Sequence, residues 1–317
     1  MKKFVLTLVV LFVIGVAGTL VTLNVSGGFS LEKYDVNDKV TVNNQNINDI
    51  NIKLSSTDIT VLPTSENEIS VELKGKISKR LKNDLKLDVK EKGNTLDISL
   101  SGEDQIKFNI GVLIVETEVN VLLPEKIYES INVHTSSGEI AIEGLQSKDF
   151  ILDVSSGEII AEDLKAERIM KFSATSGEIR TKNTTAEKIE FEASSGDFIV
   201  QDQNSKESTF IVSSGDMQLT DVTGNIQLEA SSGSISISNK EVSGNITADI
   251  TSGDVEVEFR NKPTSLAIDF HASSGDGVVN LDGVTYEENS ENRIIGKIGT
   301  GEYSVRVNAS SGDFVLR

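Results

Sequence analysis

A short tetrad recurs nine times along this 317-residue chain, and it constrains the fold more than any other feature of the sequence. Each copy has Ser or Thr, then Ser, then Gly, and in eight copies an Asp or Glu follows. The first eight glycines are 18 to 22 residues apart, and the ninth follows an insertion. A period in this range is typical of stacked repeat architectures. The nine glycines are Gly138, Gly157, Gly177, Gly196, Gly215, Gly233, Gly253, Gly275 and Gly312.

The residues around each glycine alternate between apolar and polar. In the fourth copy, Phe191 and Ala193 precede the turn, and Phe198 and Val200 follow it, with polar residues between most of them. This period of two predicts a strand on each side of the turn. A single repeat cannot bury its apolar side chains, so neighbouring repeats must stack in parallel and in register. The sequence therefore predicts an all-β fold, a parallel β-helix or β-solenoid with coils of about 19 residues stacked ~4.8 Å apart.

The regular solenoid is expected over residues 126–317, where the tetrads recur. The chain stops at Arg317 directly after a repeat strand, and this end shows little capping, so we expect it to be an open edge for pairing. A turn that connects the coils needs glycine for its conformational freedom, and Ser and Asp side chains bond locally to turn backbone. Stacked serines are also expected to bond from coil to coil. The nine tetrads are thus predicted to be structural turns.

Residues 50–125 are less regular and are expected to form the start or cap of the solenoid. The stretch 50–61, "INIKLSSTDITV", fits the repeat as a degenerate coil with Thr57 in the glycine position. Residues 85–100 are typical of a hairpin that turns at Gly93-Asn94. Residues 26–49 are rich in Gly, Asn and Asp, and we expect them to be a linker.

The N-terminus predicts membrane attachment and export. Lys2 and Lys3 precede a mostly apolar run over residues 4–25, long enough as a helix to cross a bilayer core of ~30 Å. Because lysines stay on the cytoplasmic side, the rest of the chain should lie outside the membrane. We therefore expect residues 1–25 to be a single-pass anchor in the cell membrane. A signal peptide cleaved near Gly15-Val16-Ala17 is the alternative.

Composition excludes several classes of function. The chain has no Cys, so disulfides and thiolate metal sites are excluded. Its net charge is −19, which argues against nucleic acid as a partner because phosphate binding needs a basic face. The tetrad serines also lack a catalytic setting. A nucleophilic serine needs a base within reach, and the two histidines, His134 and His271, both fall in a polar, outward column of the repeat. No catalytic residue and no cofactor is predicted.

The acidic residue after each glycine is the one part of the tetrad with a candidate chemistry. Parallel stacking puts these side chains in one row, where like charges ~5 Å apart repel. The row must therefore be exposed to solvent, bonded to turn amides, or bridged by cations. A ladder of bound Ca²⁺ is one hypothesis, although the sequence lacks the glycine-rich nonapeptide of calcium-binding rolls. The row contains Glu139, Glu158, Glu178, Asp197, Asp216, Asp254, Asp276 and Asp313, with Ser234 as an interruption.

The repeat also carries a resemblance. The pattern of "TSSGEI" and "SSGDF" turns after an N-terminal apolar segment resembles the bacterial "putative adhesin" β-strand-repeat family, a domain of unknown function, over about residues 40–317. The resemblance implies a β-solenoid with a role at the cell surface, and it brings no catalytic residues. An anchor followed by these repeats is also similar to the layout of a membrane-anchored accessory protein encoded in a bacterial cell-envelope stress operon.

Together these features favour a membrane-anchored, extracytoplasmic binding or scaffold module with a protein or envelope partner. The alternative is an enzyme acting on cell-wall polysaccharide. Such an enzyme needs clustered acids and aromatic sugar platforms. The chain has no Trp and only four scattered Tyr, and the loop at 282–296 is the one conspicuous departure from the repeat.

Overall fold

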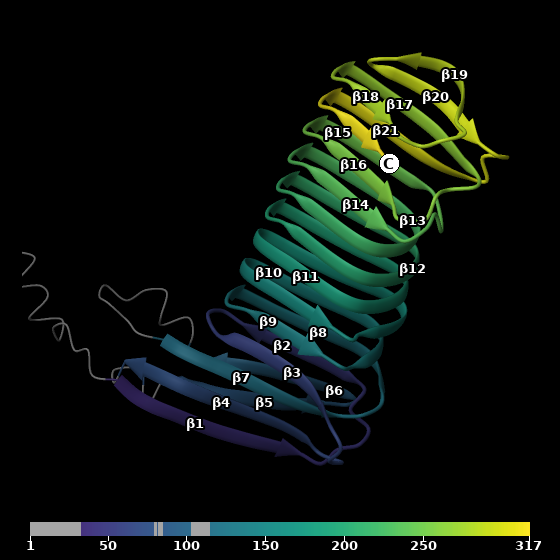
Figure 1. Cartoon of the computed structure of the whole chain (residues 1–317). Coiled ribbons are helices and arrows are strands. Elements are labelled where there is room, and N and C mark those ends of the chain that lie inside the picture. Colours follow the sequence, from purple (N-terminus) through teal and green to yellow (C-terminus); the bar gives the residue numbers. More distant parts are fainter. Residues whose placement is uncertain (1–32, 79–80, 82–84, 103–114) are drawn as a thin grey trace, which may run out of the picture.

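The protein is an elongated rod of stacked β-strands (Figure 1). The computed structural model describes residues 33–78, 81, 85–102 and 115–317, and these residues contain twenty-two strands. No helix in these residues is long and apolar enough to span a membrane. The predicted anchor at residues 1–25 lies outside the described residues.

The middle of the rod consists of coils that stack in parallel and in register, as the repeat predicted. Leu152 pairs with Val133 in the coil before it and with Phe172 in the coil after it. The strands of this part are β8 (Ile127–Ser137), β9 (Ile140–Glu143), β10 (Gln146–Glu162), β11 (Lys165–Ser195), β12 (Phe198–Ser214), β13 (Met217–Ser232), β14 (Ile235–Asn239), β15 (Ile246–Ser252) and β16 (Val255–Phe259).

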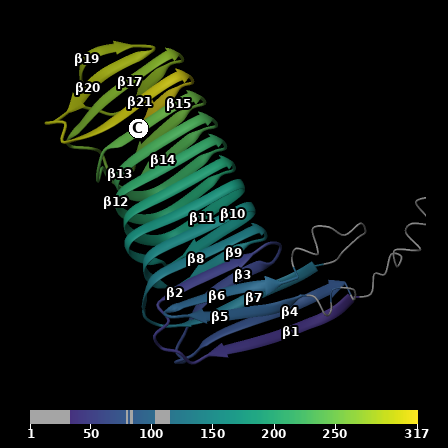
Figure 2. The ribbon, with the colours of Figure 1, turned by 180° about the vertical axis from the view of Figure 1, so that it is seen from behind.

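The core is the space enclosed by the coils, and the alternating apolar residues fill it. Phe172, Phe191 and Phe210 occupy the same position in successive coils and are fully buried. Their rings stack with centroids 4.9 and 4.7 Å apart. Aromatic pairs at this separation add to the free energy gained from burial alone. The repeat therefore generates a continuous column of ring contacts inside the stacked coils, and Figure 2 shows these coils from behind.

Each coil has a second corner on the side away from the tetrad. In four successive coils this corner is held by Asp163, Asn183, Asp202 and Asp221, all with φ between 52° and 54°. Asn and Asp are among the few residues besides glycine that adopt this left-handed conformation readily. Ion pairs also link coils, such as Arg260 with Asp221 at this corner and Lys148 of β10 with Glu129 of β8.

The N-terminal part begins with a coil that the sequence predicted correctly. Strands β2 (Asp49–Leu54) and β3 (Asp58–Thr64) stack directly against β8 and β9. Beyond this coil, β2 pairs with β6 (Thr95–Ser101), and β3 pairs with β7 (Val115–Pro124). The predicted hairpin is also present, because β5 (Lys86–Lys92) pairs antiparallel with β6 across Gly93-Asn94.

Our prediction of a linker at residues 26–49 is wrong for the residues that form the first described strand. Lys33–Val42 forms strand β1, which pairs antiparallel with β4 (Ile69–Ser78), and β4 pairs with β7. Tyr34, Val36, Val40 and Val42 alternate with polar residues and lie toward the core. This period of two was not recognised in the sequence, because Asp and Asn residues stand between the apolar ones. The strand covers the sheet edge that β4 would otherwise expose.

The C-terminal coil does not form an open edge, contrary to our expectation for Arg317. Strands β21 (Tyr303–Ser311) and β22 (Phe314–Leu316) lie between the coil of β15 and β16 and the coil of β17 (Leu266–Ser274) and β18 (Gly277–Val279). The rod ends instead in β19 (Thr285–Ser290) and β20 (Arg293–Ile298). The antiparallel pairing of β20 with β17 caps the end of the stack.

The aromatic column gives a test of the core. Replacing Phe191 by Ala removes a ring that stacks on both neighbours, and we expect it to lower the free energy of unfolding by about 3–5 kcal/mol. Ile151, in the outward column, is 43% exposed, so I151A should change it by less than about 0.5 kcal/mol. Urea unfolding curves of both variants measure the difference. Equal losses would contradict the assignment of the core face.

Candidate functional site

The tetrad corner is built by glycine because two coils approach each other closely there. Each of the nine tetrad glycines has a φ between +123° and +151°, where other residues are strained. A Cβ placed on Gly177 would lie 1.7 Å from the carbonyl oxygen of Gly157, and one on Gly157 would lie 2.0 Å from that of Gly138. Both the backbone conformation and the spacing between coils therefore require glycine at this corner.

The serines of the tetrads behave differently from our expectation. We expected their hydroxyls to bond to turn backbone or from coil to coil. In the part of the chain that the structure describes, no side chain of the nine Ser/Thr-Ser pairs forms a hydrogen bond to another residue. The pairs follow one another along the tetrad edge, and most of their side chains are exposed to solvent. They therefore present a regular array of hydroxyls outward.

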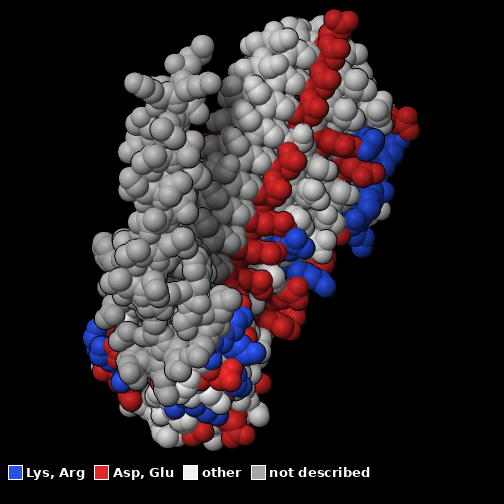
Figure 3. Space-filling view, turned by 90° about the vertical axis from the view of Figure 1, so that its left-hand side faces the viewer, with Lys and Arg blue, Asp and Glu red and all other residues white. Residues whose placement is uncertain are grey.

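Four of the five aspartates of the row are bonded to turn amides, one of the three arrangements that the sequence left open. The backbone N–H of Asp216 donates to the Asp197 carboxylate at 2.8 Å, and that of Ser234 donates to the Asp216 carboxylate at 2.8 Å. Asp254 and Asp313 each accept the same bond from the next coil, at 2.9 Å. Each bond links two coils and offsets part of the repulsion within the row. Figure 3 shows the acidic side chains as a line along the rod.

The glutamates of the row are placed otherwise, because their longer side chains extend past the turn amides. Arg180 forms ion pairs with both Glu158, at 2.9 Å, and Glu178. Among the described residues, no Lys or Arg forms an ion pair with Glu139. Burial raises the pKa of its carboxyl, and the charges of Glu158, Asp58 and Glu118 raise it further.

No arrangement for a metal ion is found in the described ranges. They contain no group of three or more His, Asp or Glu side chains that could hold one. The hypothesis of a calcium ladder therefore stays a hypothesis, and the backbone amides and Arg180 are the partners that the structure gives to the row. The histidines lie far apart: His134 contacts Asp153 at 2.9 Å, while His271 belongs to the C-terminal cap region. The described part of the chain shows no hydrogen bond from a tetrad serine to either histidine.

A shallow groove of about 730 Å³ lies on the outer face next to the tetrad edge. It crosses five coils, which contribute one strand each: β12, β13, β15, β21 and β17. Two outward columns line it. One column consists of Ile211, Glu229, Asp249, Asn308 and His271, and the other consists of the tetrad residues Ser213, Ser231, Thr251, Ser310 and Ser273.

The groove combines acidic and other polar groups with apolar side chains such as Ile211 and Ile250. Glu229 and Asp249 are exposed carboxylates, and none of the described residues that line the groove is Lys or Arg. Asn308 donates a hydrogen bond to Asp249 at 2.8 Å and so orients one of the two acids. Hydroxyls, carboxylates and an amide at a regular spacing can accept and donate hydrogen bonds to a polar ligand, and the acids favour a cationic one.

The aligned positions of the repeat predicted that the residues of the two lining columns face outward, but they did not predict that these residues form a groove. The order of the coils in space differs from their order in the sequence, so Asn308 lies between Asp249 and His271. No repeat pattern could show that insertion. Arg180 was missed as well, because its position two residues after Glu178 gave no sign that it would also reach Glu158.

Comparison with protein families gives one match, which covers most of the chain. A family model described as Toastrack DUF4097 matches residues 47–317. The comparison with curated proteins found no match.

Several solved structures are similar to this chain at low sequence identity. A protein described as a "putative lipid binding protein" from Parabacteroides distasonis is 15% identical, with a TM-score of 0.54 over 90% of this chain and 97% of that chain. A "putative adhesin" from the same species is 12% identical, with a TM-score of 0.45 over 89% and 97% of the two chains. Another "putative adhesin", from Bacteroides fragilis, is 10% identical, with a TM-score of 0.45 over 91% and 98%. The first of these shows that the fold is shared.

The amide bonds of the row can be tested at Asp216. Replacing Asp216 by Ala removes the acceptor of the Ser234 amide, and we expect a loss of about 1–2 kcal/mol in the free energy of unfolding. D216N keeps an oxygen acceptor without the charge and should lose less than half as much. Urea unfolding measures both variants. Equal losses for the two variants would contradict the role of the acceptor.

Glu139 gives a test that depends on pH. Its pKa in the folded state lies above the ordinary value of 4.5, so the folded state binds its proton more tightly than the unfolded state does. Stability from this group is therefore lost as the pH rises through the window between those two pKa values. E139Q should raise the melting temperature at pH 7, and the gain should vanish below pH 4.5. E143Q, at an exposed position near the other corner, is the control. An unchanged melting temperature of E139Q at pH 7 would contradict the prediction.

Proposed function

The chain belongs to the Toastrack DUF4097 family, and we propose that it is an anchored rod that binds a cell-envelope partner outside the membrane. Residues 4–25 hold it in the membrane, with Lys2 and Lys3 on the cytoplasmic side. The β-solenoid projects outward and acts as an adhesin-like module or as an accessory protein of the envelope-stress response.

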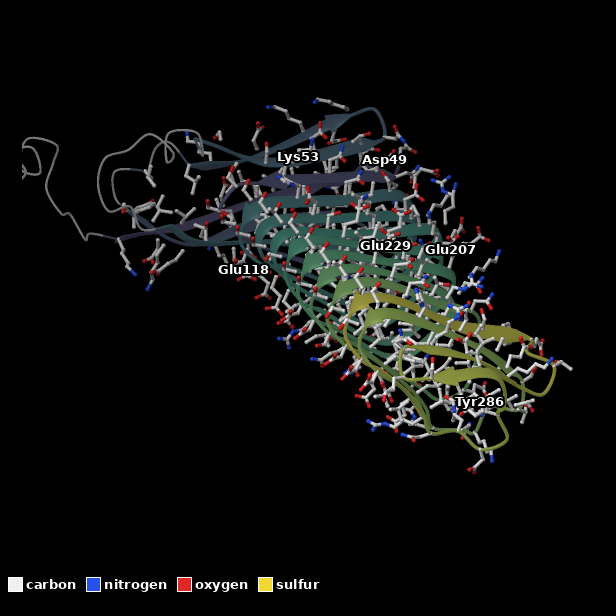
Figure 4. The ribbon with its side chains drawn as sticks, turned by 90° about the horizontal axis from the view of Figure 1, so that it is seen from above. Asp49, Lys53, Glu118, Glu207, Glu229 and Tyr286 are labelled. Carbon is white, nitrogen blue, oxygen red and sulfur yellow. The ribbon has the colours of Figure 1, made fainter. Side chains whose placement is uncertain are left out.

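The observation that carries this proposal is the position of the groove along the rod. The coils that line it belong to the half of the rod farther from β1, where the described chain begins (Figure 1). Asp49 and Lys53 of the first coil lie toward one end of the rod, and Tyr286 of the cap lies at the other (Figure 4). Ten stacked coils at ~4.8 Å per step place the last coil about 43 Å from the first. An anchor before β1 would hold the groove well away from the membrane.

The lining of the groove restricts the partner. Glu229 and Asp249, with no Lys or Arg among the described lining residues, favour a polar or cationic partner and disfavour nucleic acid, teichoic-acid-like polymers and other polyanions. A surface without aromatic anchors binds weakly at each position, so affinity arises from contacts repeated over several coils.

Charge reversal in the groove tests the proposal. The full chain is cross-linked in its native membranes, purified, and compared with E229K/D249K. We expect the wild type to recover an envelope component and the variant to lose at least ~10-fold of it, because close like charges in an interface oppose binding.

The matched control is E143K/E162K, which makes the same change of charge at residues outside the groove on neighbouring coils. It should recover the partner at the wild-type level. Equal recovery by both variants, or recovery of no envelope component by the wild type, would contradict the proposal. Release of soluble sugar from isolated cell walls by the wild type alone would favour the alternative of a polysaccharide-active enzyme.

A further inference from the structure

The coil of β21 and β22 occupies a slot between two coils that are consecutive in the sequence. β21 pairs in parallel with β15 on one side and with β17 on the other. β22 pairs in the same way with β16 and β18. The chain thus leaves the space of one coil empty when it passes from residue 259 to residue 266, and residues 303–316 fill that space later (Figure 1).

The inserted coil fits the slot through buried apolar side chains. Five of its residues point into the core and are between 0 and 8% exposed. The ring of Phe314 stacks on Phe270 of the cap coil with centroids 5.2 Å apart. Without the inserted coil, these neighbours would lose a core layer and both flanking coils would expose unpaired backbone edges. The five residues are Val305, Val307, Ala309, Phe314 and Leu316.

Polar contacts fix the register of the inserted coil. Asp313 donates its amide to Asp254 and accepts the amide of Asp276, both at 2.9 Å. Asn308 donates to Asp249 at 2.8 Å, and Ser304 of the same strand donates its amide to Asn245 at 2.9 Å. These four bonds therefore favour one register of the inserted coil in the slot.

A single short segment joins the inserted coil to β20. This segment is residues 299–302, "GTGE", in which Gly299 and Gly301 have φ of +59° and +71°. The contacts inside the slot are the same whichever copy of the chain supplies the coil, so an exchange between copies changes only this hinge. Exchange must compete with insertion of each coil into its own slot, which is favoured by the high effective concentration of a coil attached to the same chain.

We propose that the coil of β21 and β22 is an exchangeable element through which two copies of this chain associate. The coil of each copy occupies the slot between β15–β16 and β17–β18 of the other. The slot lies toward the end of the rod away from β1, where neighbouring rods on one membrane can reach each other. This association uses backbone pairing and buried apolar contacts of the inserted coil, and the same coil supplies Asn308 and Ser310 to the groove.

Engineered cysteines detect the exchange, because the chain has no Cys of its own. Asp249 and Asn308 are direct partners in the parallel register of β15 and β21, a geometry within the range of a disulfide. D249C and N308C, with different tags, are co-expressed as full chains, oxidised and separated without reductant. We expect a disulfide between the two chains at a yield at least ~10-fold above that of the control mixture, because exchange converts a chance collision into a fixed contact.

The control mixture is E229C with D249C. These residues are also partners in register, but both lie outside the exchanged coil, so only collision can link the two chains. The double variant D249C/N308C closes within one chain and shows that the pair can form a disulfide. Equal yields from the two mixtures would overturn the proposal.

A second measurement needs no disulfide. The wild-type chain in detergent is concentrated and then diluted, and its dimer fraction is measured by size-exclusion chromatography with light scattering. We expect the wild-type chain to form a dimer. An excess of the synthetic peptide 302–317 should lower the dimer fraction by at least ~5-fold, since the peptide competes for the slot. A scrambled peptide should have no effect. Absence of a dimer at all concentrations, or a dimer that both peptides leave unchanged, would overturn the proposal.

Discussion

The close approach of backbones at the tetrad corner is the constraint on which the rest of the structure depends. Gly177 lies so near the Gly157 carbonyl oxygen that no Cβ fits between them. With every coil turning at the same point and at the same spacing, the strands on both sides must pair in register. The register then places Phe172 over Phe191 in the core and Asp197 beside the Asp216 amide at the surface. One local steric requirement thus sets both the core and the outer columns.

The sequence predicted the parts of the fold that follow from this requirement. Period-two columns around each glycine predicted the stacked coils, and "INIKLSSTDITV" predicted a coil that lacks the glycine. Thr57 is tolerated there because this coil is the first of the stack, and its other side meets β6 and β7 instead of another tetrad. Strand β1 was missed because Asp and Asn residues obscured its period of two, and because its partner β4 lies 27 to 45 residues further along the chain.

The candidate site could be predicted only as columns of side chains. Serine hydroxyls were expected to stabilise the turn, yet the glycine conformation and the backbone pairing already do so, and the hydroxyls remain exposed. The carboxylates showed the opposite behaviour. Asp has the length that reaches the amide of the next coil, whereas Glu158 and Glu178 need Arg180. Asp and Glu differ by one methylene group, and this difference therefore decides whether a carboxylate of the row is bonded to a backbone amide or paired with Arg180.

The inserted coil explains why the groove forms where it does. If residues 266–279 followed directly on the coil of residues 246–259, His271 would lie beside Asp249; instead Asn308 lies between them and bonds to Asp249. The C-terminal coil therefore supplies a wall of the groove as well as a layer of the core. A change in the occupancy of the slot would alter both at once, because the same strand carries Val307 inward and Asn308 outward. The binding face and the exchangeable coil are thus coupled through one strand, β21.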